Sequence, residues 1–114
     1  MEHDIQVACI EWCLWSQSKY PGLEYIFAIP NGGHRHIGTA IRLKNEGVKP
    51  GVPDLFLPVA KRNFNGLFLE IKTPKGAVSK PQEKFMSGVI SLGFLACIIR
   101  SIDDFTKTIE WYYD

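Results

Sequence analysis

The chain has 114 residues and a formal net charge of +1, with 46% hydrophobic and 22% charged residues. This length and composition are typical of one soluble globular domain, so we expect a single domain over residues 1–114. No apolar run reaches the roughly 18 residues that cross a bilayer, and the acidic start is unlike a signal peptide. Three irregularly spaced cysteines argue against a disulfide framework, which favours a cytoplasmic protein without a membrane partner.

The segment from Met1 to about Ser18 predicts a helix that stops at Tyr20-Pro21-Gly22. Its apolar residues recur at the 3.6-residue spacing of a buried stripe: Ile5, Ala8, Cys9, Trp12 and Cys13. The two cysteines could join His34 and His36 in a zinc site, but both fit the stripe, so we interpret them as core residues. Glu2 and Gln6 are four residues apart and share one helix face.

Residues 23–29 predict the first strand, which ends at the turn Pro30-Asn31-Gly32-Gly33. Two glycines would let backbone N–H groups approach an anion, and Arg35 could then hold a phosphate. A tight turn with exposed basic residues explains the same sequence. A short helix follows, with a left-handed cap expected at Gly47; it is marked by Ile37, Ala40, Ile41 and Lys44.

Two apolar runs, Gly51–Pro58 and Leu67–Lys72, flank the polar loop Lys61–Gly66 and predict a β-hairpin. Side chains alternate along a strand, so one face of the second run is apolar and the other carries Glu70 and Lys72. The apolar face, which we expect in the core, comprises Leu67, Leu69 and Ile71, and Phe68 shares the other face.

Two hairpin registers are open. If Val59 lies opposite Leu67, then Asp54 lies opposite Lys72 and diagonal to Glu70. A slip of two residues places Asp54 opposite Glu70. Either register brings two carboxylates and one ammonium within roughly 5 to 8 Å of each other.

Two neighbouring carboxylates repel each other unless a cation or a shared proton relieves them. A hard divalent ion held by oxygen ligands, Mg²⁺ or Mn²⁺, would relieve them, polarise a phosphoryl oxygen and lower the pKa of a bound water. Lys72 would stabilise charge that develops on the phosphate. This arrangement predicts a phosphodiester-cleaving site. The alternative is an exposed strand with an ordinary Glu70–Lys72 ion pair and Asp54 as a turn residue.

Three further elements complete the fold. Ser79-Lys80-Pro81-Gln82 predicts a capping box at the start of a helix that runs to Leu92 and stops at Gly93. Phe94–Arg100 predicts a strand buried on both faces and parallel to Leu67–Lys72. Ser101 should cap a last helix through about Tyr113, with two buried residues, Phe105 and Ile109. The predicted fold class is α/β, in the order αβαββαβα, with a mixed four-stranded sheet flanked by helices.

Pro53-Asp54, then fifteen residues, then Glu70-Ile71-Lys72 resemble the signature of the PD-(D/E)xK nuclease superfamily. Surrounding segments narrow the resemblance to virus-type replication-repair nuclease (VRR-NUC) domains: Pro30-Asn31-Gly32-Gly33, Gly47–Leu55, Gly66–Thr73, Gly76 and Ser79-Lys80-Pro81-Gln82. The resemblance extends from Glu2 to about Ser101. It implies a restriction-endonuclease-like core and metal-dependent hydrolysis of phosphodiester bonds, in keeping with DNA replication or repair.

The resemblance also implies roles for individual residues at the centre of the site. Asp54, Glu70 and the carbonyl of Ile71 would hold the metal ion. Lys72 would orient the attacking water or stabilise the developing charge.

Two helical residues would support this site. In the family an acid in a Glu-x-x-x-Gln arrangement on the first helix helps to position metal or water, and Glu2 with Gln6 matches it. Glu2 is therefore a candidate catalytic and metal-binding residue, although the helix dipole also favours an acid there. In the superfamily a Gln on the helix after the catalytic strand points back at the site; Gln82 matches it, and capping alone also explains that residue.

The basic residues gather in the middle of the chain. Ten of the thirteen Lys and Arg residues lie between Asn31 and Lys84, together with four of the twelve acids. Such polarity suits a phosphate-facing surface, and charge asymmetry is also common in solvated proteins. The candidate nucleic-acid contacts are Asn31, Gly32, Gly33, His34, Arg35, Arg42, Lys44, Lys49, Lys75, Lys80 and Lys84.

Aromatic residues near the two ends of the chain exceed what a core this small requires: Trp12, Trp15, Trp111, Tyr112 and Tyr113. They would form a dimer interface or a base-stacking platform, and we favour the dimer. A two-fold dimer places two sites against two strands, and short members of the family resemble Holliday junction resolvases, which work as such dimers. We therefore expect a Mg²⁺- or Mn²⁺-dependent endodeoxyribonuclease for branched, Holliday-junction-like DNA. The alternatives are a non-catalytic DNA-binding or assembly module and a metal-dependent ribonuclease.

Overall fold

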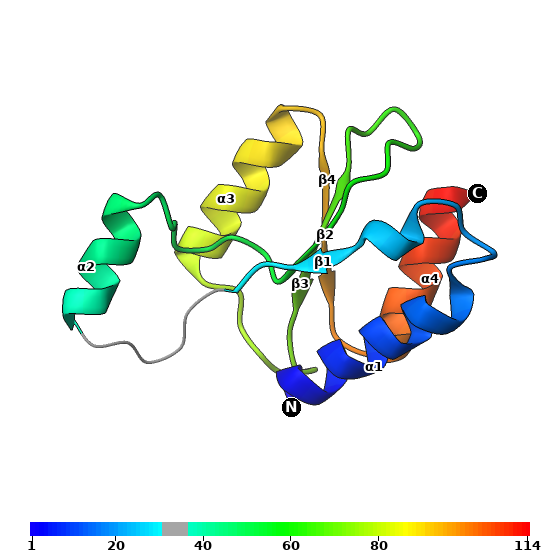
Figure 1. Ribbon diagram of the computed structural model, residues 1–114, viewed down its shortest axis with the longest axis horizontal. Helices are drawn as coiled ribbons and strands as arrows, with labels where there is room; N and C mark the ends of the chain where they lie inside the picture. Colours follow the sequence, from blue (N-terminus) through cyan, green and yellow to red (C-terminus); the bar gives the residue numbers. More distant parts are fainter. Residues whose placement is uncertain (31–36) are drawn as a thin grey trace.

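The computed structural model describes residues 1–30 and 37–114 (Figure 1). The predicted order αβαββαβα is confirmed, with one additional 3-10 turn, η1, after the first helix. The elements are α1 (Glu2–Ser16), η1 (Leu23–Tyr25), β1 (Phe27–Ala28), α2 (Ile37–Asn45), β2 (Leu55–Leu57), β3 (Leu67–Ile71), α3 (Lys80–Ser91), β4 (Leu95–Ile99) and α4 (Ile102–Tyr113). Within the described residues, no helix is long and apolar enough to cross a membrane.

The four strands form one mixed sheet in the order β1-β2-β3-β4, with antiparallel pairing except between β3 and β4, which are parallel. In the hairpin Leu57 pairs with Leu67 and Leu55 with Leu69, so Asp54, just before β2, comes opposite Glu70. The slipped register is confirmed and the register that pairs Val59 with Leu67 is wrong. The Val59 carbonyl instead accepts a hydrogen bond from the Tyr112 hydroxyl, which draws the hairpin loop toward α4.

The sheet is covered on two sides (Figure 1). One face packs on α1 and α4, and its core residues are fully buried: Leu67, Leu69, Ile71, Cys9, Phe105, Ile109 and Tyr112. Cys13, which is 4% exposed, joins them, so the interpretation of both cysteines as core residues is confirmed. Burial raises the pKa of both thiols to about 12, which favours neutral thiols over thiolate ligands.

The other face of the sheet carries a cluster of aromatic rings beneath α3. Phe68 lies at its centre, with ring centroids 4.5 Å from Phe56, 5.6 Å from Phe94 and 5.7 Å from Phe85 of α3. These contacts attach α3 to the strand that carries Glu70. The capping box at Ser79 and Gln82, the stop at Gly93 and the Ser101 cap are all present as predicted.

Two strand predictions need correction. Residues 23–29 do not form one strand, because Leu23 and Tyr25 donate to carbonyls three residues back and make the turn η1, which leaves only Phe27–Ala28 for β1. The strand β4 was predicted to be buried on both faces, which is wrong. Within the part of the chain that the structure describes, it is an edge strand that pairs only with β3, and Ile98 is 39% exposed.

The helix α2 projects from the side of the molecule (Figure 1). None of its residues is buried, and Ile37 and Ile41 are 76% and 57% exposed. Gly47 follows it with a φ of 102°, in agreement with the predicted left-handed cap. The apolar residues of α2 therefore contribute no buried side chain to the core.

The prediction that five aromatic residues near the chain ends form surplus surface is wrong for Trp12, Tyr112 and Tyr113. Tyr112 is fully buried, and Trp12 and Tyr113 pack against the core. Of these five residues, two remain on the surface: Trp15, which is 86% exposed, and Trp111, which is 47% exposed.

Candidate active site

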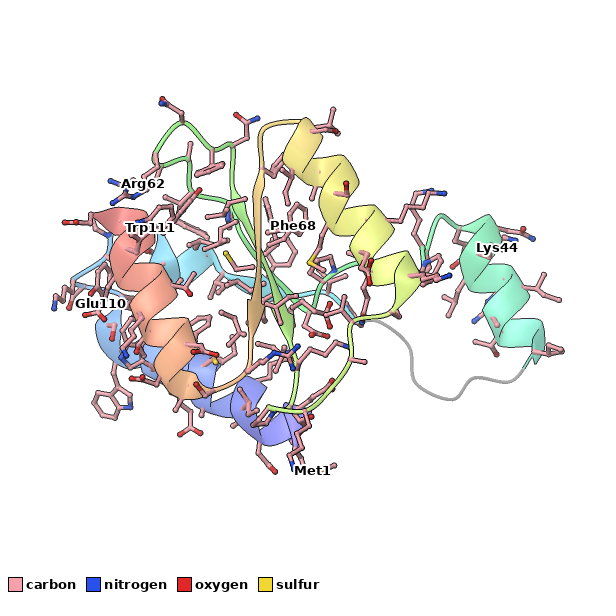
Figure 2. All side chains as sticks on the ribbon, turned by 180° about the vertical axis from the view of Figure 1, so that it is seen from behind. Met1, Lys44, Arg62, Phe68, Glu110 and Trp111 are labelled. Atoms are coloured by element: carbon pink, nitrogen blue, oxygen red, sulfur yellow. The ribbon has the colours of Figure 1, made fainter. Side chains whose placement is uncertain are left out.

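Side chains from different elements meet at the C-terminal end of β3. Glu70 lies in β3, Lys72 directly follows it, and Asp54 directly precedes the neighbouring strand β2. Gln82 comes from the first turn of α3 and Glu2 from the first turn of α1. Figure 2 labels Met1, which caps α1. The predicted central residues are thus brought together by a hairpin and two helix N-termini.

Asp54 is fixed by hydrogen bonds to both neighbouring strand segments. Its Oδ2 accepts a hydrogen bond of 2.8 Å from the amide of Ile71, and its carbonyl accepts one of 2.8 Å from the amide of Ile29. The bond from Ile71 is charge-assisted when Asp54 is ionised, which makes it a strong orienting contact. The carboxyl group is therefore held beside Glu70 by the backbone of β3 itself.

Glu70 is the most deeply buried acid of the site, with only 3% of its surface exposed. Its Oε2 accepts a hydrogen bond of 3.2 Å from Gln82 and lies 4.0 Å from the ammonium of Lys72. Its Oε1 is buried and has no hydrogen-bond partner among the described residues. A buried carboxylate oxygen without a partner is costly, so this atom marks a position where a proton or a cation would be stabilised.

The pKa of Glu70 reflects these surroundings. Burial and then the negative charge of the neighbouring Asp54 raise it from 4.5 to about 8, and a proton on Glu70 can be shared with the Asp54 carboxylate. Lys72 lowers this pKa and Glu2 raises it. At neutral pH a proton therefore takes the place that a cation can occupy between the two acids.

Gln82 both caps α3 and contacts Glu70, the two roles that the sequence alone leaves open. Its backbone amide donates to Ser79 Oγ at 3.3 Å, and its side-chain oxygen accepts from the Ser79 amide at 2.9 Å. The side-chain nitrogen remains available and donates to Glu70. The cap therefore locks the rotamer that reaches the site.

The residues present fit a hard divalent ion. Mg²⁺ commonly uses one or two protein carboxylates and retains several waters. Asp54 and the unpartnered oxygen of Glu70 supply such a pair. The described residues contain no group of three or more His, Cys, Asp or Glu side chains that could hold a metal ion. Glu2 is exposed and influences Glu70 through its charge, without completing a three-acid cluster.

The predicted phosphate contacts fall into three groups. Lys75 and Lys80 lie on the segment between β3 and the first turn of α3, close in sequence to the carboxylates, and Lys84 follows one turn later on α3. Lys49 is on the segment that leads to Asp54, whereas Arg42 and Lys44 lie on the projecting helix α2. The remaining candidates lie outside the described residues: Asn31, Gly32, Gly33, His34 and Arg35.

Arg100 is a contributor that the sequence analysis missed. Its Nη1 donates to the carbonyls of Thr73 and Gly76, both at 2.8 Å, and so fixes the turn that carries Lys75. The available signal was an arginine at the end of an otherwise apolar strand. The bonds span more than twenty residues, so the partner could not be identified from local sequence.

Comparison with known proteins agrees with this geometry. The family model of the VRR-NUC domain matches residues 2–103. A solved structure described as a VRR_NUC domain protein is 26% identical, covers 97% of this chain and 86% of its own, and superimposes with a TM-score of 0.80. No curated protein matches the chain. The chain therefore belongs to the VRR-NUC family, and this membership implies a nuclease of the PD-(D/E)xK type.

Proposed function

We propose that this protein is a Mg²⁺- or Mn²⁺-dependent endodeoxyribonuclease that cleaves branched DNA as a homodimer. The observation that carries the proposal is Glu70, a buried acid with one unpartnered oxygen, placed between Asp54 and Lys72. In a purely structural ion pair, a buried carboxylate oxygen normally has a hydrogen-bond partner. The site instead offers a negatively charged position with an ammonium beside it.

In this mechanism Asp54, Glu70 and the carbonyl of Ile71 would hold the ion, and Glu70 would have to be ionised to do so. The chemistry that such an ion would supply is polarisation of a phosphoryl oxygen and a lower pKa of a water molecule beside it. Lys72 orients the attacking water or stabilises the charge that develops on the phosphate. Lys72 is only 9% exposed, so water screens the positive charge of its ammonium group weakly.

Supporting residues keep this arrangement in place. Gln82 holds Glu70 Oε2 through a rotamer set by the cap, and Glu2 contributes negative charge from α1. Lys49, Lys75 and Lys80 would contact DNA phosphates, which position the substrate without conveying base sequence.

The proposal is tested by incubating a four-way junction, a flap and a plain duplex with the protein and Mn²⁺. We expect cleavage of the branched DNAs, and a loss of at least about a hundredfold in Asp54→Asn and Lys72→Ala, because each variant removes a group that stabilises the transition state. Lys107→Ala is the matched control, since Lys107 pairs with Asp103 on the exposed face of α4.

Three outcomes would contradict the assignment. If Asp54→Asn and Lys72→Ala cleaved DNA as fast as the parent, Asp54 and Lys72 would be excluded as catalytic groups. Salt-dependent binding of the junction without any hydrolysis would indicate a non-catalytic DNA-binding module. Cleavage of RNA in preference to DNA in the same assay would indicate a ribonuclease.

A further inference from the structure

A groove outside the carboxylate site lies between α3 and the segment that precedes β2. In Figure 2, α3 stands between Phe68 of the sheet and the helix α2, which carries Lys44. The groove has a volume of about 580 Å³, within the range of sites that hold small ligands. Its principal lining residues are Lys49, Pro50, Pro81, Lys84, Phe85 and Val89.

The charge of this groove favours an anion. Lys49 comes from the segment before β2 and Lys84 from α3, so a lysine lines each wall. Among the described residues, no acid lines the groove. Most of the remaining lining is apolar, including Phe85, whose ring also packs edge-on against Phe68. A ligand that suits it combines an apolar body with negative charge.

The groove adjoins the proposed active site. Pro81 lines it and the next residue, Gln82, hydrogen-bonds Glu70, while Pro50 begins the short segment that leads to Asp54. The two walls touch at Gly51, where a Cβ atom would clash with the carbonyl group of Pro81. This contact fixes the groove relative to the carboxylates.

We propose that the groove binds an unpaired nucleotide of the DNA substrate. Its base would lie on the apolar floor, and its phosphates would contact Lys49 and Lys84. A base within a duplex is stacked between its neighbours and cannot enter such a groove, whereas an unpaired base has its faces free for stacking. The inference rests on the proposed nuclease function and refines it, because it makes unpaired DNA beside the cut a determinant of substrate choice.

An acidic peptide with apolar side chains would satisfy the same charge and polarity. The nucleotide is favoured by position, since two lining residues, Pro50 and Pro81, lie close in sequence to Asp54 and Gln82 of a site whose proposed substrate is a phosphodiester. A DNA strand that passes Asp54 and Glu70 would bring its next nucleotides to Pro50 and Pro81.

Gly88→Leu offers a way to fill the groove. Gly88 lines it, and a Cβ atom there would meet no atom within 4 Å. Leucine also favours helix more than glycine does, so we expect the variant to fold. Ser87→Leu is the matched control, because Ser87 is an exposed neighbour on α3 that does not line the groove.

Binding is measured first, by fluorescence anisotropy of a short oligothymidylate without metal, so that the result does not depend on hydrolysis. We expect Gly88→Leu to bind at least about tenfold more weakly than the parent and Ser87→Leu to bind as the parent does, since one stacked base is lost. Lys84→Ala should reduce the slope of the logarithm of the binding constant against the logarithm of the salt concentration by about one, as expected for the loss of one phosphate contact.

Cleavage is measured second, on a flap and on a plain duplex with Mn²⁺. We expect Gly88→Leu to lower cleavage of the flap selectively. Should no DNA be cut by the parent, the proposed function fails while the binding result still decides the groove.

The inference is overturned if Gly88→Leu binds the oligothymidylate as tightly as the parent. It is also overturned if an acidic, leucine-containing peptide displaces the oligonucleotide and binds more tightly than it, because the groove would then be a protein-docking site.

Discussion

At Glu70 the fold places an ionisable group where its charged form is unfavourable. The side chain is almost completely buried, Asp54 adds negative charge, and Lys72 offsets only part of both effects. Such perturbed acids concentrate at functional sites, where stability is exchanged for chemistry. The proton on Glu70 should therefore influence folding as well as metal binding.

This leads to a prediction on pH. In the metal-free protein the pKa of Glu70 is about 8, against 4.5 in the unfolded chain, so the folded state binds the proton more tightly. The stability that this proton supplies is fully present below pH 4.5 and is lost as the pH rises through 8. We expect unfolding in urea with EDTA to require less urea at pH 8.5 than at pH 5.

Glu70→Gln should flatten this pH dependence, because glutamine does not titrate. The difference in the free energy of unfolding between pH 5 and pH 8.5 should shrink by an amount on the order of a few kcal/mol. Glu46→Gln, an exposed residue just after α2, is the control and should retain the parental slope. A parental slope in Glu70→Gln would show that another group causes the pH dependence. Addition of Mn²⁺ should restore the stability of the parent at pH 8.5, because the ion binds the folded state.

At the scale of the element, the N-terminus of α3 combines a cap with a site contact. Ser79 Oγ accepts from the Gln82 amide, while the Gln82 side chain reaches both the Ser79 amide and Glu70. Two variants should separate these tasks. We expect Ser79→Ala to cost about 1 kcal/mol of stability with cleavage nearly unchanged.

Gln82→Glu should have the reverse effect. A glutamate keeps the oxygen that caps Ser79, but it removes the donor to Glu70 and adds negative charge there. We expect parental stability in thermal unfolding and a cleavage rate at pH 7 lower by roughly tenfold or more, partly recovered at higher pH as Glu70 loses its proton. Equal loss of cleavage in both variants would mean that Gln82 acts only through the cap.

The contact between Gly51 and α3 can be tested in the same way. Gly51 has a φ of 81°, and its Cα lies against the Pro81 carbonyl, whereas Gly47 has a φ of 102° and open space around it. Gly47→Ala should cost about 1 kcal/mol, from the backbone conformation alone. Gly51→Ala should cost more by roughly 1–3 kcal/mol, because the new methyl group must separate the segment before Asp54 from α3. Equal unfolding temperatures would contradict this contact.

At the scale of the whole molecule, the two exposed tryptophans differ in their surroundings. Arg62 stacks over Trp111 with its guanidinium carbon 4.1 Å from the ring centroid, and its Nε donates to the Trp111 carbonyl at 2.7 Å. These contacts tie the hairpin loop to α4, at the end of the molecule remote from Met1 (Figure 2). Trp15 is 86% exposed, beside Leu14, which is 63% exposed.

The proposed homodimer therefore has a specific prediction. We expect sedimentation at micromolar concentration to give the mass of a dimer, and Trp15→Ser to shift it toward the monomer, because aromatic residues supply much of the energy of an interface. Ile41→Ser, on the projecting helix α2, is a control for loss of an exposed apolar side chain. A parent that sediments as a monomer would contradict the dimer.

Much of this organisation could be predicted because it depends on neighbours in sequence. The caps at Ser79, Gly93 and Ser101 follow from local hydrogen bonding and glycine conformation. The hairpin and the alternation of side chains were sufficient to predict that Asp54, Glu70 and Lys72 would gather. The parallel pairing of β4 with β3 followed from the intervening helix.

Sequence by itself therefore determined the order of the elements and the faces on which the polar residues lie. Only the tertiary structure decided the register, in which Leu57 pairs with Leu67, and the burial that leaves one oxygen of Glu70 without a partner among the described residues. The tertiary structure also decided that one glutamine, Gln82, both caps α3 and donates to Glu70. The physical reason is that side-chain alternation and caps act over a few residues, whereas burial and pKa depend on elements that are distant in sequence and cover the site together.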